Sequence, residues 1–456
     1  MRLKKIMLSS LVSVILATQF SSTLYAADIK EIPAEEIESV YEGAVDSNSW
    51  EGWVEGPKIY SESGIVMDMD SGTILYAKNI DDQHYPASIT KVMTALVALE
   101  NYEMDETVKF TWEDFGCVPT GYAHIGIKPD EELSMEDCLY GMLLASANEV
   151  SHAIGAHIEG GHEEFLRVMN DMAKNLGCTN SNWTNTNGIH DPEHYTSARD
   201  MALIGSAVFK HEKFREIVNT PTYVIGETNI TNETRPFRQN HKMIFENGEY
   251  YYEYCVGGKT GYTDASLTTL VTFATKDDMN LVAVVMRTHG GGANAYTDTR
   301  AMMDYAFENF SKLTVDKEVL DDVSVASVKE GSYVILPKNV DVQQLSNAME
   351  KPTEENDKTG IVSYTYAGNK VGEIEFEITD EEYDKIHNVK EKEEMAKKQE
   401  LKSNISQISK IVLIVATILV ILYFVLLGYV TYRRRQIKKK RQEMRRKQQR
   451  NRRNQK

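Results

Sequence analysis

The sequence predicts an α+β protein, in which an antiparallel sheet packed with helices is followed by a small all-β domain and one C-terminal transmembrane helix. Strand-like apolar runs at both ends of the first domain enclose a helical middle. Beyond residue 312 the pattern changes to short alternating runs, and a long uncharged segment lies near the C-terminus. A chain of 456 residues accommodates two domains and terminal segments.

The N-terminus predicts export. Met1 to Lys5 is basic, Ile6 to Phe20 is largely apolar, and small residues lead to Ala26, which is the pattern of a secretory signal. We therefore assign residues 1–26 to a signal peptide cleaved after Ala26, with a retained N-terminal anchor as the alternative. Residues 27–56 form an acidic leader.

Residues 57–312 form the first predicted domain. Asp70-Ser71-Gly72 separates two apolar runs and indicates a hairpin. Apolar alternation predicts the other strands, and helical periodicity predicts the helices. The expected strands are 64–69, 73–76, 251–256, 268–274 and 281–286, and the expected helices are 88–100, 135–157, 163–176 and 297–309.

A small all-β domain is predicted over residues 313–379. Its short alternating runs include Tyr333 to Leu336, and a hairpin turns at Gly368-Asn369. Residues 380–410 are dense in charges of both signs at helical spacing and predict a solvated stalk helix.

The segment 411–432 is predicted to span a membrane. Its first twenty residues carry no charge, and a helix of that length crosses a hydrocarbon core of about 30 Å. Arg433-Arg434-Arg435 follows at once, so the positive-inside rule puts the tail, residues 433–456, in the cytoplasm. The folded domains then lie outside a cell membrane that the chain crosses once. A buried core helix is the alternative.

Charge differs between the two sides of that membrane. The chain carries −18 overall, but the tail and the signal together hold seventeen basic residues and one acidic residue, which leaves the external part near −34. The acidic surface of this external part argues against nucleic acid as a partner. The tail is expected to lie against anionic membrane headgroups, with binding of RNA or a cytoplasmic protein as the alternative.

The first motif with chemical meaning is Ser88-Ile89-Thr90-Lys91, at a predicted helix start. Three-residue spacing on a helix puts the hydroxyl of Ser88 and the amine of Lys91 on one face. A serine needs a base in order to attack, and a partly desolvated lysine has its pKa lowered enough to serve as one. Such pairs also recur on solvated helices, so the motif indicates little by itself.

Two further motifs follow along the chain. Ser146-Ala147-Asn148 offers a second hydroxyl and an amide on a turn, although a plain helix-ending turn is the alternative interpretation. Gly257-Gly258-Lys259-Thr260-Gly261 combines glycines beside a strand with a fixed positive charge. A phosphate-binding loop does not fit, because its first glycine would fall on Glu253.

In this order the three motifs are the signature of penicillin-binding proteins and class A β-lactamases. Residues from about 64 to 310 resemble the low-molecular-mass D-alanyl-D-alanine carboxypeptidases, which are serine peptidases with a β-lactamase/transpeptidase-like catalytic domain. The small β domain also resembles that family's layout. The matching segments are Asp70-Ser71-Gly72, Pro86 to Thr94, Asn187 to Asp191 and Lys259 to Thr263.

The resemblance implies removal of the terminal D-alanine from peptidoglycan pentapeptides, and acylation by β-lactam antibiotics, without cofactor or metal. It implies Ser88 as the nucleophile, Lys91 as the general base and Ser146 as a proton relay, with the backbone N–H groups of Ser88 and Tyr262 as the oxyanion hole. The implied substrate-binding residues are Asn148, Lys259, Thr260, Gly261, Tyr262 and Thr263.

The chain departs from the family pattern in two places. Tyr262 stands where family members often carry histidine. The arginine that helps to bind the substrate carboxylate in many members has no clear counterpart, because neither Arg287 nor Arg300 is clearly in register.

Several alternatives stay open or are set aside. His190, Asp191 and His194 lie among turn dipeptides, so no metal site is expected there. Four cysteines lack metal-ligand spacing, and export permits a disulfide whose connectivity we do not assign.

Two rival functions are a β-lactamase, which shares the nucleophile, and a catalytically idle wall-binding or scaffold protein.

Overall fold

The structure is a computed structural model that describes residues 32–352 and 357–453. The predicted signal peptide lies outside the described residues. The described part of the leader contains a helix, α2 (Ala34–Tyr41), and a 3-10 turn, η1 (Asp46–Ser49).

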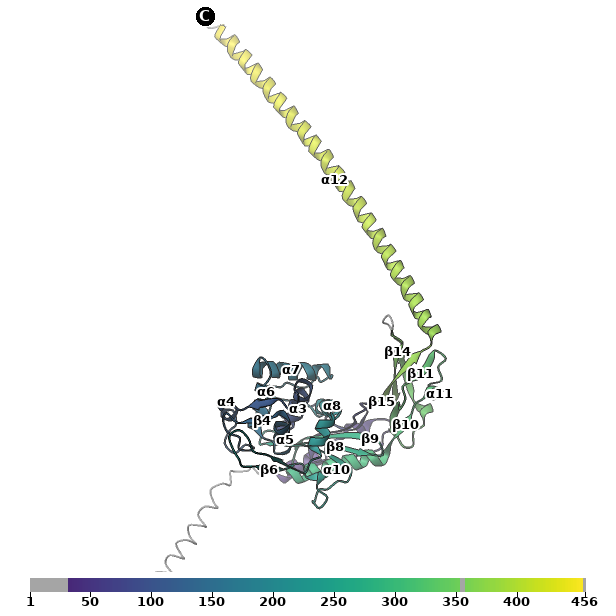
Figure 1. Ribbon diagram of the computed structural model, residues 1–456. Helices are drawn as coiled ribbons and strands as arrows, with labels where there is room; N and C mark the ends of the chain where they lie inside the picture. Colours follow the sequence, from purple (N-terminus) through teal and green to yellow (C-terminus); the bar gives the residue numbers. More distant parts are fainter. Residues whose placement is uncertain (1–31, 353–356, 454–456) are drawn as a thin grey trace, which may run out of the picture. The chain divides into compact units, whose positions relative to one another are not determined.

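A five-stranded antiparallel sheet forms the centre of the first domain, with the strand order β2-β1-β9-β8-β7. Its strands β8 and β9 are labelled in Figure 1. Strands from the two ends of the domain therefore lie side by side, which confirms the predicted antiparallel sheet. The strands are β1 (Ser61–Asp68), β2 (Ile74–Lys78), β7 (Cys255–Thr263), β8 (Leu267–Lys276) and β9 (Met279–Thr288).

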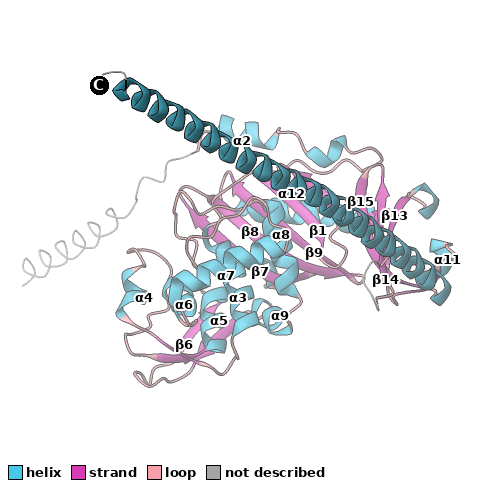
Figure 2. Ribbon diagram, turned by 90° about the horizontal axis from the view of Figure 1, so that it is seen from above, coloured by secondary structure: helices cyan, strands magenta, loops and turns pink. Residues whose placement is uncertain are grey.

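Helices cover both faces of this sheet, with α8 and α10 on opposite sides of β8 and β9 (Figure 1). Figure 2 shows the strands of the sheet in magenta. Val282 and Val284 of β9 join the main hydrophobic core, which α3, α5 and α8 complete, while the alternate residues Ala283 and Val285 are buried on the other face, where α10 packs. A strand buried on both faces forms a continuous apolar run. The helices are α3 (Thr90–Asn101), α4 (Trp112–Gly116), α5 (Met135–Leu144), α6 (Asn148–Ala156), α7 (Gly161–Asn175), α8 (Ala198–Phe209), α9 (Glu212–Val218) and α10 (Gly292–Asn309).

Short elements complete the first domain. They are the 3-10 turns η2 (Ala87–Ile89) and η3 (Lys242–Ile244), and the two-stranded ribbons β3 (Thr107–Lys109) with β4 (Glu132–Ser134) and β5 (Thr222–Ile225) with β6 (Arg235–Arg238).

Two sequence predictions were wrong in detail. The helix expected over 135–157 is two helices, because Ser146 between them adopts a left-handed φ of +62°. The strand expected over 251–256 begins only at Cys255, so the glycine-rich motif lies inside β7 and not after a strand. Glycine is depleted in strands, and a bulge between Cys255 and Gly257 further interrupts the pairing, so the alternation pattern did not reveal this element.

The region after α10 is rich in short strands. Among these, β10 pairs with β12, and a four-stranded sheet has the order β11-β15-β14-β13. The predicted hairpin at Gly368-Asn369 joins β14 to β15. The elements are β10 (Phe310–Thr314), α11 (Lys317–Leu320), β11 (Val325–Val328), β12 (Tyr333–Pro337), η4 (Val342–Gln344), β13 (Ser346–Glu350), β14 (Thr359–Tyr366) and β15 (Asn369–Ile378).

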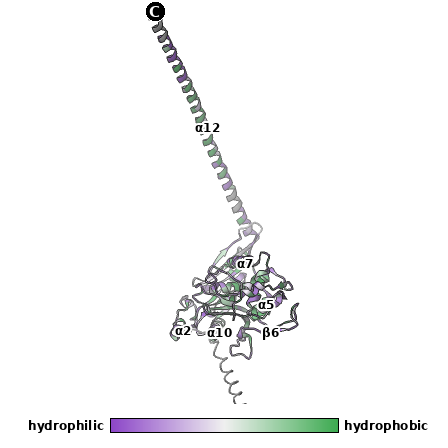
Figure 3. Cartoon of the chain, turned by 90° about the vertical axis from the view of Figure 1, so that its left-hand side faces the viewer, coloured by the Kyte–Doolittle hydropathy of each residue, from purple (hydrophilic) through white to green (hydrophobic). Residues whose placement is uncertain are grey.

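The C-terminal segment is one continuous helix, α12 (Asp380–Arg453), which includes the predicted stalk, the predicted span and most of the tail. Its hydrophobic stretch is green in Figure 3. Within residues 32–352 and 357–453, α12 alone is long and apolar enough to cross a membrane.

Candidate active site

Ser88 lies in the turn η2, which leads directly into α3. The turn begins at Ala87, whose φ of +50° is unusual for a residue with a side chain. Gly188 packs against it so closely that a Cβ atom at position 188 would lie 1.8 Å from the Ala87 carbonyl oxygen. The turn that presents Ser88 is therefore fixed by a contact that only glycine permits.

Lys91 lies one helical turn after Ser88 and is fully buried. Its Nζ is 3.0 Å from Ser88 Oγ, 2.8 Å from Asn148 Oδ1 and 2.6 Å from the Asn187 carbonyl oxygen. Burial, and then the charge of Lys259, lower the pKa of Lys91 well below its usual value of 10.5. In its neutral form this amine would donate to the two amide oxygens and accept from the Ser88 hydroxyl, because a neutral amine has two N–H donors and one lone pair.

Ser146 lies in the turn between α5 and α6, where its positive φ directs the hydroxyl toward β7. Asn148 begins α6. The Ala123 carbonyl accepts from both the Asn148 backbone N–H, at 3.0 Å, and its side-chain amide, at 2.9 Å. This double contact leaves Asn148 Oδ1 facing Lys91.

Lys259 of β7 is also fully buried. Its Nζ donates to Ser146 Oγ at 3.0 Å and to the Thr260 carbonyl oxygen at 2.8 Å. Burial lowers the pKa of Lys259 to about 7. Two amines of lowered pKa thus contact two hydroxyls, one each, an arrangement typical of sites that move protons.

Among the residues that the structure describes, β7 is the edge strand of the sheet and pairs only with β8. Gly261 allows its backbone to approach the Ser88 turn, because a Cβ atom at 261 would lie 2.9 Å from the Ser88 backbone nitrogen. Tyr262 follows with 56% of its surface exposed. An unpaired strand edge beside a nucleophile is suited to an extended peptide, which can add as a further strand.

A cleft of 860 Å³ opens over these residues. Lys91 and Lys259 are buried behind the hydroxyls that they contact. The other predicted site residues line the cleft, namely Ser88, Ser146, Asn148, Thr260, Gly261, Tyr262 and Thr263.

Thr263 lines the cleft but is mostly engaged in the turn between β7 and β8. Its Oγ1 lies 2.8 Å from Ser266 Oγ, and its backbone N–H donates to the same hydroxyl at 2.9 Å. These contacts shape the turn that follows Tyr262.

Sequence reasoning did not identify several parts of the cleft wall. These are the loop 121–123, Asn240 and Lys242 beside η3, and Tyr296 of α10. No motif marks them, since they reach the cleft only through tertiary packing.

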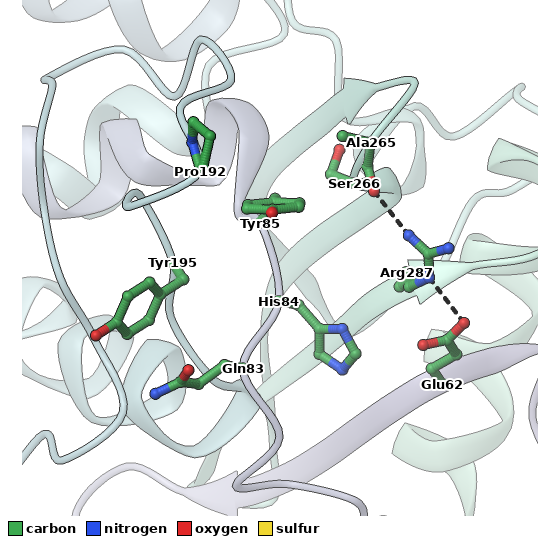
Figure 4. A pocket seen from close by; sticks show the side chains of 9 residues that line it. All are labelled: Glu62, Gln83, His84, Tyr85, Pro192, Tyr195, Ala265, Ser266 and Arg287. Atoms are coloured by element: carbon green, nitrogen blue, oxygen red, sulfur yellow. Dashed lines mark hydrogen bonds and ion pairs between the residues drawn. The ribbon is translucent and has the colours of Figure 1, made fainter.

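Both candidate arginines form hydrogen bonds outside the cleft. Arg287 lies in a separate pocket of 370 Å³, where it donates to Glu62 Oε1 at 2.8 Å and to the Ala265 carbonyl at 2.7 Å (Figure 4). Arg300 of α10 donates to the carbonyl oxygens of Tyr250 and Tyr251. Neither arginine lines the cleft above Ser88.

The histidine-rich turn serves packing. His194 is buried, its Nε2 is 2.8 Å from Thr90 Oγ1, and its Nδ1 accepts from the Thr184 backbone N–H at 3.0 Å. Burial lowers the pKa of His194 to about 3, which keeps the ring neutral. Within the part of the chain that the structure describes, no group of three or more metal-ligating side chains occurs. All four cysteines are free thiols, so the permitted disulfide does not form.

The fold and the paired Ser–Lys contacts define a serine acyl-transferase of the penicillin-binding class. Residues 51–290 match the sequence profile of the D-alanyl-D-alanine carboxypeptidases, and this match covers more than half of the chain. The protein therefore belongs to this family of serine D-alanyl-D-alanine carboxypeptidases, which confirms the family resemblance.

Individual relatives agree with that assignment. The chain is 30% identical over 278 residues to the D-alanyl-D-alanine carboxypeptidase DacF of Bacillus subtilis, a match covering 59% of this chain and 67% of the relative. It is 28% identical over 274 residues to DacC of Escherichia coli, a match covering 57% of this chain and 64% of the relative. The alignments thus span about two thirds of each relative's length.

A solved structure supports the fold. The Streptomyces K15 DD-transpeptidase superposes with a TM-score of 0.52 at 25% identity, over 56% of this chain and 100% of that protein. The predicted transpeptidase-like fold is confirmed.

Proposed function

We propose that this protein removes the terminal D-alanine from peptidoglycan pentapeptides through an acyl-enzyme on Ser88. The observation that carries the proposal is the contact of 3.0 Å between Ser88 Oγ and the buried Nζ of Lys91. A hydroxyl beside an amine held neutral by burial is an activated nucleophile.

Acylation begins when the Ser88 hydroxyl attacks the carbonyl between the two terminal D-alanines and its proton passes to Lys91. The oxyanion accepts hydrogen bonds from the backbone N–H groups of Ser88 and Tyr262. Losing one such donor costs about 3 kcal/mol of transition-state stabilisation.

The leaving D-alanine needs a proton on its amine. Ser146 supplies it and is replenished through Lys259, to which it is hydrogen-bonded at 3.0 Å. Water then attacks the Ser88 ester and gives a proton to Lys259 through Ser146, while Ser88 takes back the proton held by Lys91, which releases the shortened peptide and restores the hydroxyl.

Substrate binding follows from the edge position of β7. The peptide adds along Thr260 to Tyr262 as an extra strand, with Asn148 holding a backbone carbonyl. Thr260 lines the cleft beside Ser88 and faces the region of the terminal carboxylate, and Thr263 shapes the adjoining turn. β-Lactams enter as acylating inhibitors of the same serine.

The proposal includes export and membrane attachment. Residues 1–26 direct the chain out of the cytoplasm, 411–432 span the membrane, and the basic tail stays inside. The apolar stretch of α12 and the arginines that follow it support this topology.

The direct test measures D-alanine released from a pentapeptide. The parent protein should release it, and Ser88→Ala should not, whereas Ser206→Ala on α8 should match the parent. Equal release by the parent and Ser88→Ala would contradict the proposal. Rapid turnover of a fluorescent penicillin without peptide hydrolysis would favour a β-lactamase, and no activity toward either would favour a scaffold protein.

A further inference from the structure

The substrate of the proposed function ends in a carboxylate, so the cleft needs a cation to recognise it. Both arginines near the cleft are committed to other partners, as described above. Lys259 is buried and donates to Ser146 and Thr260. Among the described residues that line the cleft, Lys242 is the one basic side chain.

Lys242 is exposed and open to a ligand. Its Nζ lies 5.5 Å from the centre of the Tyr250 ring, which stacks on Tyr296 at 4.7 Å. Tyr296 itself lines the cleft. The ammonium group thus lies over an aromatic pair at the cleft wall, where a carboxylate can approach without first breaking an ion pair to any residue that the structure describes.

The backbone around Lys242 is fixed at the catalytic centre. The Asn240 N–H donates to the Leu144 carbonyl at 3.2 Å, two residues before Ser146. His241 is fully buried, with its Nε2 2.9 Å from Thr272 Oγ1 of β8. It also packs on β7, since a Cβ atom at Gly258 would lie 2.8 Å from the His241 ring.

The next backbone group is held as well. The Lys242 N–H donates to the Tyr296 hydroxyl at 3.2 Å, which ties η3 to α10. The segment 240–242 is therefore anchored to α5, β7, β8 and α10, and its one charged side chain faces the cleft that contains Ser88.

Resting on the proposed function, we infer that Lys242 is a specificity residue that binds the C-terminal carboxylate of the stem peptide, taking the part that an arginine would play. An ammonium–carboxylate hydrogen bond is stronger than a neutral one. Because the surroundings of the domain are acidic, a single cation determines where a carboxylate binds.

The test compares two substrates that differ only in this carboxylate, diacetyl-L-lysyl-D-alanyl-D-alanine and its C-terminal amide. Mass spectrometry measures the release of D-alanine or D-alaninamide by the parent, Lys242→Gln, Lys242→Arg and the control Lys174→Gln, whose lysine is exposed on α7. The ratio of kcat/KM for acid over amide should fall about tenfold in Lys242→Gln, mainly through KM for the acid. The parent ratio should persist in Lys242→Arg and Lys174→Gln.

Two results would overturn the inference while leaving the proposed function intact. One is an unchanged acid-to-amide ratio in Lys242→Gln, and the other is an equal loss toward both substrates, which indicates a structural role. A parent protein that releases nothing from the free acid would instead contradict the proposed function, and the inference with it.

Discussion

The reactivity proposed for Ser88 depends on residues far away in the sequence. The neighbouring Lys91 donates to Asn148 and Asn187, which lie on two other segments, and its charge is disfavoured by burial and by Lys259. A Ser-x-x-Lys pair on a solvated helix lacks these contacts and keeps a protonated lysine. The chemistry therefore belongs to the assembled site and not to the motif alone.

The lowered pKa of Lys91 predicts an acid limb in the rate of acylation. The neutral amine is the base, so the reactive form dominates above the lowered pKa and disappears as the pH falls through it. Over the range below pH 10.5, the second-order rate of labelling by a fluorescent penicillin should first stay constant and then fall as the pH drops through the lowered pKa. The apparent pKa belongs to the lysine pair, because Lys91 and Lys259 interact.

The control for that profile is Lys91→Met, which should be slower than the parent by a factor of about 10² to 10⁴ above the lowered pKa and should lack the acid limb. A parent rate that does not change with pH over the same range would mean that Lys91 is not the base.

At the residue scale, sequence reasoning identified the residues with chemical motifs and missed those without. Ser88, Ser146 and Thr260, which the family resemblance implies as site residues, line one cleft. Lys242 carries no motif, and the engagement of Arg287 with Glu62 depends on packing between β1 and β9 that no local pattern encodes.

At the scale of elements, the deviations from prediction lie at the site itself. The break between α5 and α6 and the glycine-rich β7 both contradict local propensity. Each has a functional consequence, since the break aims Ser146 at Lys259 and the glycines bring β7 against the Ser88 turn. The apolar strands β8 and β9 were predicted correctly because burial on both faces leaves a clear pattern.

The turn that holds Ser88 gives a prediction for this scale. Gly188→Ala should reduce acylation by about 10²-fold, because the added Cβ would displace Ala87 and with it the nucleophile. Gly177→Ala is the matched control, with a φ of +86° close to the +82° of Gly188 but no atom within 4 Å of the added Cβ.

Both variants should lose about 1–2 kcal/mol of stability from the left-handed backbone, measured by denaturant unfolding. Gly188→Ala should lose more, because its Cβ overlaps the Ala87 carbonyl. Only Gly188→Ala should also lose acylation activity. Equal penicillin labelling by the two variants would show that the contact with Ala87 does not position Ser88.

At the scale of the whole molecule, the chain combines an acidic enzyme with a basic C-terminal end. Composition and hydropathy along the sequence were sufficient to predict the apolar stretch of α12, because spanning a bilayer imposes a simple length and polarity requirement. We did not predict that the charged stalk, the apolar stretch and the basic tail form one helix, because charged and apolar stretches look like separate segments in the sequence.

Deletion of residues 411–456 should move the protein from the membrane pellet to the soluble fraction after high-speed centrifugation, with the rate of penicillin labelling unchanged. Deletion of 433–456 alone, which keeps the apolar stretch, should leave it in the pellet. A pelleted 411–456 deletion would mean that another part of the chain binds the membrane.

The central claim is that Ser88 is the acylated nucleophile, and intact-mass spectrometry after incubation with penicillin tests it most directly. We predict a single long-lived adduct with the mass of one penicillin, located on Ser88 by peptide mapping and absent from Ser88→Ala. An adduct on any other residue, or one that persists in Ser88→Ala, would contradict the account.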